Sequence, residues 1–376
     1  MNQPAVSILA AMTCAAALAA AQAPATDAYK LGTFELSGRT FLGLVIGDAI
    51  VADLGEANTA FERAAGGGAR VAMPRDMKEL IVRWEDGAFK QRVAALAKAA
   101  GAAQSRPSYV RDRKTVRARP PIMYPTTILN AAVNFAEHAA EMSRASTAAA
   151  VGAAAPAAAA KSESMPGMWQ RKEGDTRHNP YYFLKPPSTV IADGEAIQLP
   201  PGREKIDWEC EIAVVVGKKA TRVPIERAAD YIFGYTIEND VSDRGGRGDT
   251  RHGSDWLIGK GHDTFAPMGP FIVPKEFIKD PQKLAIKFTL SGKVMQDSNT
   301  DRMTHNVYEM LSFASHILTL HPGDVLSMGS PAGVGTARAT PIYFKAGDTS
   351  VCTIEGIGTL SNPVVAAPDA SPSAGR

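Results

Sequence analysis

Two glutamates separated by one residue are the most informative chemical pair in the sequence. Glu209 and Glu211 lie in the run 207–216, where strand periodicity puts both carboxylates on one face and only apolar side chains on the other. The two carboxylates are then about 6–7 Å apart and lead into a hydrophobic run, which indicates partial burial, where their repulsion is costly. A divalent cation would remove that cost, whereas a solvated charged strand edge is the alternative interpretation.

Asp240, at the end of the aromatic run 231–240, is the candidate third ligand. Strand ends often present active-site groups. Three carboxylates favour a hard ion, Mg²⁺ or Mn²⁺ with Ca²⁺ as a further option, over zinc, and they leave positions for water and substrate oxygens. The alternatives are a strand-end cap for Asp240 and a surface ion pair between Asp243 and Arg244.

An imidazole and a carboxylate stand three residues apart upstream. On a helix, Glu141 can orient His138 and raise its basicity, which makes His138 a candidate general base. An amphipathic helix with His138 facing the core is the alternative.

Two further segments offer groups to an anionic substrate. Lys260 can bring a positive charge to a developing oxyanion, and its surroundings lack the spacing of a phosphate-binding loop. The turn 329–335 (GSPAGVG) can present backbone N–H groups to the substrate, although a tight structural turn explains the same sequence.

A β-rich body must position these groups. Short strand-like runs bounded by Gly, Pro or Asp occur at 181–184, 211–216, 231–238, 269–273, 284–290, 324–328 and 350–355, and a helix is predicted at 307–318. We therefore expect an α/β protein dominated by strands.

The N-terminal part predicts a small α+β domain with a linker over residues 24–121. It contains a hairpin with a turn at Gly47 and Asp48 and a helix over 76–100. A catalytic domain is expected over 122–365, with an Ala-rich mobile insert at 145–165 and a disordered tail at 366–376.

Composition excludes several classes of protein. The 376 residues are 45% apolar and 21% charged, which is typical of a globular protein rather than a disordered or fibrous one. Because 41 Lys and Arg balance 39 Asp and Glu, we expect a small-molecule partner and no nucleic acid. No stretch after the leader reaches the length of a membrane span.

The first 23 residues read as a cleaved signal peptide. An apolar run at 6–20 ends in Ala21-Gln22-Ala23, which predicts a secreted or periplasmic protein; a disordered Ala-rich leader, and hence a cytoplasmic protein, is the alternative. Of the three cysteines, Cys210 and Cys352 would remain after cleavage, and the sequence leaves their pairing open.

Seven segments, in order, resemble motifs of the fumarylacetoacetate hydrolase family. They are NAAVNFAEHAAE, YYFLKPPSTVI, DWECEIAVVVG, GYTIENDVSDR, WLIGKGHDTFAPMGPFIV, GKVMQDSNTDRM and LHPGDVLSMGSPAGVG. The resemblance covers about 122–363 and implies a rolled mixed β-sheet, usually in a homodimer. It also implies a divalent metal held by Glu209, Glu211 and Asp240.

The same resemblance implies roles for other residues. The His138/Glu141 dyad would lie on a closing lid, Lys260 matches the family's active-site lysine, and Arg244, Gly329 and Ser330 would contact substrate. Ser330 stands where threonine is usual, and Gly245-Gly246-Arg247 replaces a segment that often carries glutamine.

The expected activity is metal-dependent hydrolysis of a carbon–carbon bond in a 1,3-diketo acid of the fumarylacetoacetate or acylpyruvate type. An isomerase, decarboxylase or hydratase of a related oxo-acid is the alternative on the same fold. A secreted binding protein without turnover is the alternative from another class.

Overall fold

The computed structural model describes residues 28–66, 70–103, 106–149, 163–248, 251 and 253–368. The predicted signal peptide, most of the Ala-rich insert and the end of the tail lie outside these residues. Within the described part of the chain, no helix is both long and apolar enough to cross a membrane.

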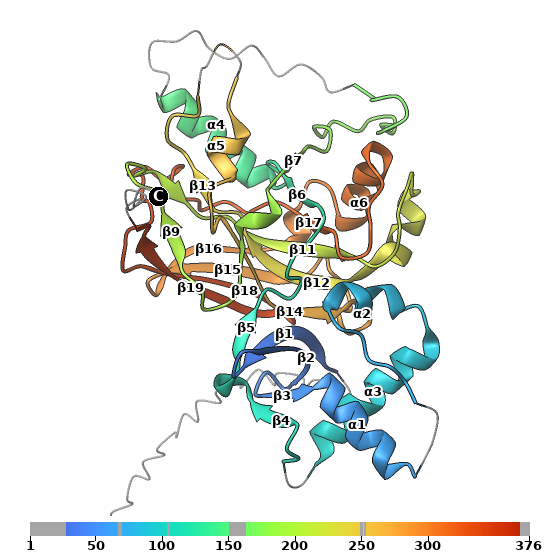
Figure 1. The fold of residues 1–376 in the computed structure, drawn as a ribbon. Helices are drawn as coiled ribbons and strands as arrows, with labels where there is room; N and C mark the ends of the chain where they lie inside the picture. Colours follow the sequence, from blue (N-terminus) through green and yellow to red (C-terminus); the bar gives the residue numbers. More distant parts are fainter. Residues whose placement is uncertain are drawn as a thin grey trace, which may run out of the picture.

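A mixed sheet forms the body of the protein and continues into the N-terminal region (Figure 1). The described residues give it twelve strands. In sheet order they are β4 (Val110–Asp112), β3 (Ile50–Asp53), β2 (Arg39–Ile46), β1 (Lys30–Leu36), β14 (Ala266–Pro274), β12 (Ile232–Asn239), β11 (Cys210–Val216), β17 (Val325–Ser327), β6 (Ile128–Ala131) and β7 (Tyr182–Leu184), with β5 (Arg117–Arg119) beside β1 and β8 (Val190–Ile191) beside β14. Most pairs are antiparallel, but β17 runs parallel to β6 and β14 parallel to β8.

A second, smaller sheet covers part of the first. Its order is β16 (Lys293–Asn299), β15 (Ala285–Leu290), β18 (Thr349–Ile354), β19 (Gly358–Ala366) and β9 (Ile197–Leu199). A short ladder pairs β10 (Ile206–Asp207) with β13 (Ser242–Asp243). The predicted β-rich α/β class is therefore confirmed.

Helices gather at opposite ends of the molecule (Figure 1). Beside the N-terminal strands lie α1 (Leu54–Ala64), α2 (Met77–Arg83) and α3 (Gly87–Ala102), whereas α4 (Ala136–Ala149), α5 (Trp256–Lys260) and α6 (Val307–Ile317) lie towards the other end. The positions of α6 and of the predicted strands agree with the sequence pattern to within a few residues.

The N-terminal region departs from one prediction. The hairpin turn forms as expected, with positive φ at Gly47 and Asp48. The single helix expected over 76–100 is instead divided into α2 and α3. Asp86 divides it, because its side chain accepts the N–H groups of Ala88 and Phe89 and so begins a new helix. The proposed domain boundaries stay a prediction, since β1 pairs directly with β14.

Both faces of β11 are buried, in two different cores. Its even-numbered residues from Cys210 to Val216 pack in the core shared with the smaller sheet, whereas Ala213 and Val215 pack in the core shared with the N-terminal helices. The alternation predicted from the sequence is confirmed. The expected partial burial is corrected to full burial, because both sides of the strand are covered by protein.

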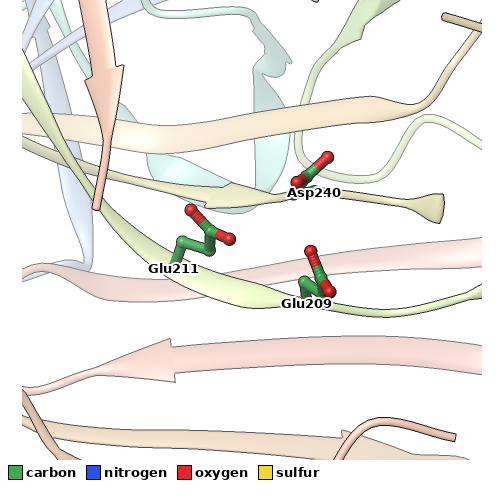
Figure 2. A group of neighbouring side chains, drawn as sticks. All are labelled: Glu209, Glu211 and Asp240. Atoms are coloured by element: carbon green, nitrogen blue, oxygen red, sulfur yellow. The ribbon is translucent and has the colours of Figure 1, made fainter. Parts of the chain in front are cut away.

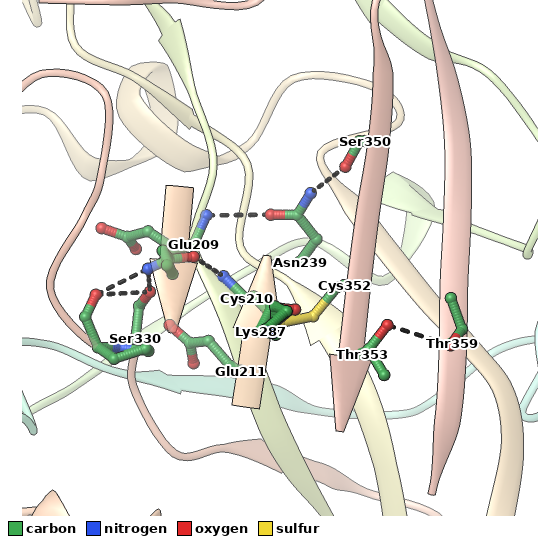
Figure 3. The surroundings of a disulfide bond; sticks show 12 residues. Glu209, Cys210, Glu211, Asn239, Lys287, Ser330, Ser350, Cys352, Thr353 and Thr359 are labelled. Atoms are coloured by element: carbon green, nitrogen blue, oxygen red, sulfur yellow. Dashed lines mark hydrogen bonds between the residues drawn. A yellow bond between two sulfur atoms is a disulfide. The ribbon is translucent and has the colours of Figure 1, made fainter. Parts of the chain in front are cut away.

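A disulfide joins the two sheets at this strand (Figure 3). Cys210, between the two glutamates, bonds Cys352 of β18, with a Cα–Cα distance of 5.6 Å. Asn239 adds a second link, because its side chain accepts the N–H of Glu209 and donates to the hydroxyl of Ser350. The backbone that carries the acidic pair is therefore held from the far sheet.

Candidate active site

The three predicted ligands meet at one point between β11 and β12 (Figure 2). One carboxylate oxygen from each of Glu209, Glu211 and Asp240 lies within 4.8 Å of the others. Cys210 pairs with Asn239 across the strands, and the Asp240 N–H donates to the Glu209 carbonyl at 2.8 Å. This pairing of neighbouring strands brings together residues that are about thirty positions apart in the chain.

Glu209 is the best-compensated acid of the three. Lys260 Nζ donates to its Oε2 at 2.8 Å and Arg244 donates to its Oε1 at 2.5 Å. Burial raises the pKa of Glu209, but the two cations outweigh burial and hold the pKa well below its usual range. Glu209 is therefore ionised before any metal binds.

Glu211 has the opposite electrostatic environment. Its Oε2 accepts the Ser327 hydroxyl at 2.6 Å and the Gly329 N–H at 2.8 Å, but its buried Oε1 has no hydrogen-bond partner among the described residues. Burial and the neighbouring acids Asp240, Glu209 and Glu238 raise its pKa well above the ordinary value. The negative charge at Glu211 thus lacks a counter-ion.

Two buried lysines hold the third acid. Lys185 Nζ donates to Asp240 Oδ1 at 2.6 Å, and Lys260 Nζ donates to Oδ2 at 2.5 Å. Both lysine side chains are almost fully buried. The carboxylate of Asp240 is therefore fixed in orientation by two opposed charged donors.

These donors fit a divalent metal ion, as predicted. Three buried carboxylates converge, one of them has an orphaned oxygen, and its charge is uncompensated. An all-oxygen donor set suits Mg²⁺, Mn²⁺ or Ca²⁺. A cation at this point would also favour the ionised form of Glu211.

The predicted dyad forms on α4 and faces the triad. His138 Nδ1 lies 2.8 Å from Glu141 Oε1, and its Nε2 lies 3.5 Å from Glu209 Oε1. Burial lowers the pKa of His138, but the two carboxylates outweigh burial and raise it. A protonated imidazole is therefore stabilised at this position.

The helix that carries the dyad is fixed at its start and on its inner face. Asn134, just before α4, donates to the carbonyls of His305 and Met328. Glu141 also accepts the N–H of Gly333 at 2.9 Å. Gly333 has φ +108°, and a Cβ there would lie 2.1 Å from the Met295 carbonyl, so only glycine allows this approach.

A small cavity of about 140 Å³ opens beside the triad. His138, Glu209, Arg244, Lys260 and Ser330 line it, together with Phe183, Trp256, Arg247 and residues of the β6–α4 connection. Thus His138, Lys260, Arg244 and Ser330 all lie at this one cavity, and their roles stay predictions.

The glycine-rich turn does not serve as expected. The N–H of Gly329 donates to Glu211, that of Gly333 to Glu141 and that of Gly335 to Asp207. These donors are used by the protein's own carboxylates, so Gly329 orients a candidate ligand rather than a substrate. The turn positions acids instead of binding an anion.

Four residues near the site escaped the sequence reasoning. Lys185 directly follows an apolar run and donates to Asp240. A lysine at the end of an apolar run was the sequence feature that could have indicated a buried charged residue. Asp207 accepts N–H groups from the turn and the Arg244 guanidinium at 3.1 Å. Glu238, opposite Glu211 in register, is buried with its pKa raised to about 7, mainly by burial. Arg247, treated only as a departure, lines the cavity.

The sequence and fold match known proteins. Residues 127–365 match the family described as fumarylacetoacetate (FAA) hydrolase C-terminal. A mitochondrial oxaloacetate tautomerase of Xenopus laevis is 41% identical over 186 residues, which is 50% of this chain and 58% of that protein. The chain thus matches little more than half the length of this relative.

Solved structures with the same fold include an isomerase and a hydrolase. A 5-carboxymethyl-2-hydroxymuconate delta-isomerase from Mycobacterium smegmatis is 28% identical, with a TM-score of 0.59 over 90% of this chain and 100% of that one. A maleylpyruvate hydrolase from Sphingobium sp. SYK-6, in complex with manganese(II) ion and pyruvate, is 26% identical, with a TM-score of 0.61 over the same shares.

Proposed function

The chain belongs to the fumarylacetoacetate hydrolase family, and on that premise we propose that it is a metal-dependent hydrolase that cleaves a carbon–carbon bond in a 1,3-diketo acid. The observation that carries the proposal is the position of His138, whose ring lies between Glu141 and the candidate metal ligand Glu209 at the small cavity. A base beside a metal site is what activation of water requires.

His138 is the proposed general base. Because Glu141 accepts from Nδ1, the proton of the neutral ring is on that nitrogen and Nε2 is free to take a proton from water. The resulting imidazolium is stabilised by carboxylates at both nitrogens. The activated water oxygen then attacks the substrate carbonyl and forms a tetrahedral intermediate.

The positive groups around the cavity support the charged steps. Lys260 and Arg244 lie next to the triad and offset charge on the oxyanion. When the intermediate collapses, the carbon–carbon bond breaks, its electron pair leaves as an enolate, and the imidazolium of His138 returns the proton. A bound divalent metal ion would supply charge stabilisation for the substrate oxygens and the enolate.

A second activity on the same site is tautomerisation or isomerisation of an oxo-acid. It is favoured by the name of the curated relative, an oxaloacetate tautomerase, and by the isomerase among the structures of the same fold. The same imidazole would move a proton between carbon and oxygen with no attack by water, so the two reactions share the base and differ in the fate of the enolate.

Product analysis separates these two activities. The protein would be incubated with Mg²⁺ or Mn²⁺ and a panel of acylpyruvates and oxaloacetate, and the products identified by NMR. Two carbon fragments from an acylpyruvate support hydrolysis. Only enol–keto interconversion would contradict hydrolysis and support the tautomerase, and inertness towards the whole panel would contradict both.

We also retain export and homodimer formation as proposals. A disulfide in the folded core supports an oxidising compartment, because such bonds are rare where thiols are kept reduced. N-terminal sequencing of the mature protein would detect cleavage after Ala23, and light scattering would give the oligomeric state; an intact N-terminus or a monomer would contradict these proposals.

A further inference from the structure

A disulfide lies between two of the candidate metal ligands in the chain (Figure 3). Cys210 is the residue between Glu209 and Glu211, so the backbone of each ligand is joined directly to it. Because side chains alternate along a strand, its sulfur lies on the opposite face, in the core shared with the smaller sheet. A shift of the Cys210 backbone therefore moves both carboxylates together.

Cys352 ties this position to the interior of the smaller sheet. In the register of that sheet, Cys352 of β18 pairs with Phe288 of β15 on one side and with Leu360 of β19 on the other. All three side chains are buried. The disulfide thus connects the ligand-bearing strand to a packed three-stranded region rather than to a surface loop.

Two buried amides add hydrogen-bonded links beside the disulfide. Gln296 of β16 accepts the N–H of Cys210 at 3.2 Å. Asn239 accepts the N–H of Glu209 at 3.0 Å and donates to the Ser350 hydroxyl of β18 at 3.1 Å. The smaller sheet therefore holds the start of β11 through a covalent bond and through the hydrogen bonds of both amides.

The charges of the carboxylates oppose the arrangement that this support maintains. One oxygen from each of Glu209, Glu211 and Asp240 lies within 4.8 Å of the others, and Glu238 stands directly opposite Glu211. Like charges at such distances repel each other in a buried region of low dielectric constant, so a less restrained strand would relax outward. A metal ion binds more tightly to ligands that are already held together, because less reorganisation accompanies binding.

We propose that the disulfide between Cys210 and Cys352 positions the metal ligands, so that its redox state sets the affinity of the site for a divalent ion. This inference rests on the proposed metal-dependent function. Reduction by a dithiol supplies two electrons and two protons: the S–S bond breaks, two thiols form, and the dithiol closes to a cyclic disulfide. The reduced protein keeps the same three carboxylates on a less restrained strand, and its affinity for the metal falls.

This coupling acts in both directions. If the disulfide strengthens metal binding by a given factor, bound metal must stabilise the disulfide against reduction by the same factor. A cross-link that supports the fold without positioning the ligands leaves the two equilibria independent. Metal affinity and the equilibrium of reduction are therefore separate measurements of one quantity.

The first measurement is calorimetric titration of the metal-free full chain with Mn²⁺. Wild-type protein is titrated in the oxidised form and after incubation with dithiothreitol until the number of free thiols is constant, with the reductant then removed under argon. Cys352→Ser is titrated too, because it lacks the bond without any reductant. We expect the dissociation constant to rise roughly 10–100-fold in both, the usual effect of losing a group that supports a metal ligand.

Leu360→Ala is the matched control. Leu360 is buried opposite Cys352 in the same sheet, so its truncation leaves a cavity there and lowers the urea midpoint, but it cuts no covalent or hydrogen-bonded link to β11. We expect its dissociation constant for Mn²⁺ to stay within about twofold of the oxidised wild type.

The second measurement is the thiol–disulfide equilibrium in dithiothreitol buffers, with and without saturating free Mn²⁺. Alkylation and mass spectrometry count the thiols. We expect Mn²⁺ to shift the equilibrium constant of reduction towards the disulfide by the same factor that calorimetry gives.

Each outcome decides one claim. Equal Mn²⁺ affinity of the oxidised and reduced wild type would overturn the positioning role and leave the metal site intact. An equal loss of affinity in Leu360→Ala, or unfolding of the wild type on reduction as seen by circular dichroism, would also overturn it, because the disulfide would then act on the fold as a whole. If the oxidised wild type bound no Mn²⁺, the metal-dependent function would fail and this inference with it.

Discussion

Two adjoining spaces at the candidate active site differ in how their charges are arranged. The inner cavity is the small one beside the triad, and the outer pocket is a larger cavity of about 840 Å³ that shares Met142, Arg244 and Arg247 with it. Around the inner cavity, acids and cations are interleaved: Lys185 and Lys260 hold Asp240, and Lys260 and Arg244 hold Glu209. Of the three candidate ligands, only Glu211 keeps an oxygen without a hydrogen-bond partner among the described residues. In the outer pocket, four cations face one space without acidic partners among the described residues.

This difference indicates that the inner groups hold the site in a fixed geometry, whereas the outer groups are available to attract a ligand. Groups that are buried and paired before a ligand binds keep their geometry. Among the three candidate ligands, Glu211 lacks a counter-ion, and a metal ion would supply one. Groups that are exposed and unpaired attract a ligand over a longer range but tune its affinity more weakly. Changes in the inner region should therefore abolish chemistry, whereas changes in the outer pocket should have smaller effects.

The largest expected effect comes from His138→Ala. Loss of the base should lower kcat about 10²–10⁴-fold, the usual contribution of a positioned general base, and should leave Mn²⁺ binding unchanged. Steady-state kinetics and calorimetry on the same preparation measure both. Unchanged turnover would remove His138 from the mechanism, and lost metal binding would show that its role is structural.

The next effect concerns the strand that carries the inner acids. Removing the disulfide with Cys352→Ser should lower the free energy of unfolding by about 2–4 kcal/mol, because the cross-link closes a long segment of the unfolded chain. Urea unfolding measures this change. Wild-type protein treated with a reductant is the control and should match the variant; if reductant leaves wild-type stability unchanged, the two cysteines are not paired.

The smallest effect concerns a cluster whose charges are already paired. Arg177 bridges Asp175 and Glu309 and so ties the segment before β7 to α6. Although burial raises the pKa of Glu309, the nearby His305 ring and the hydrogen bonds from Arg177 lower it to about 2. A carboxylate with a depressed pKa stabilises the fold above its ordinary pKa, and this stabilisation is lost as pH falls towards 2.

Arg177→Gln should therefore cost on the order of 1 kcal/mol at pH 7 and less near pH 3. Chemical unfolding at the two pH values tests this. A cost that is larger at pH 3 would reverse the predicted sign and would contradict the ion-pair explanation.

Local patterns predicted the elements well because they depend on neighbouring residues. The alternation of residues 210–216 gave the two faces of β11, and the spacing of His138 and Glu141 gave their hydrogen bond. Convergence of the triad was inferred from motif resemblance together with strand geometry. That inference agrees with the structure because β11 and β12 are neighbours in the sheet.

Contacts that depend on the order of the strands in the sheet could not be predicted from local sequence patterns. Lys185, just after the edge strand β7, donates to Asp240 at the end of β12, although β11, β17 and β6 lie between these two strands in the sheet order, so no periodicity reports such a contact. For the turn 329–335 the sequence leaves substrate binding and a structural turn open for a related reason: glycine signals that a backbone approaches something closely, but it does not identify the group approached. Here that group is Glu141, Glu211 or Asp207.

The central claim is that Glu209, Glu211 and Asp240 hold one divalent cation. Calorimetric titration of metal-free protein with Mn²⁺ tests it directly in wild type, Glu211→Gln and Glu238→Gln. Glu238 is the matched control, because it is a buried glutamate directly opposite Glu211 that does not belong to the triad. We predict one equivalent of Mn²⁺ in the wild type and in Glu238→Gln and none in Glu211→Gln. Stoichiometric binding that survives in folded Glu211→Gln, or no binding by the wild type, would contradict the account.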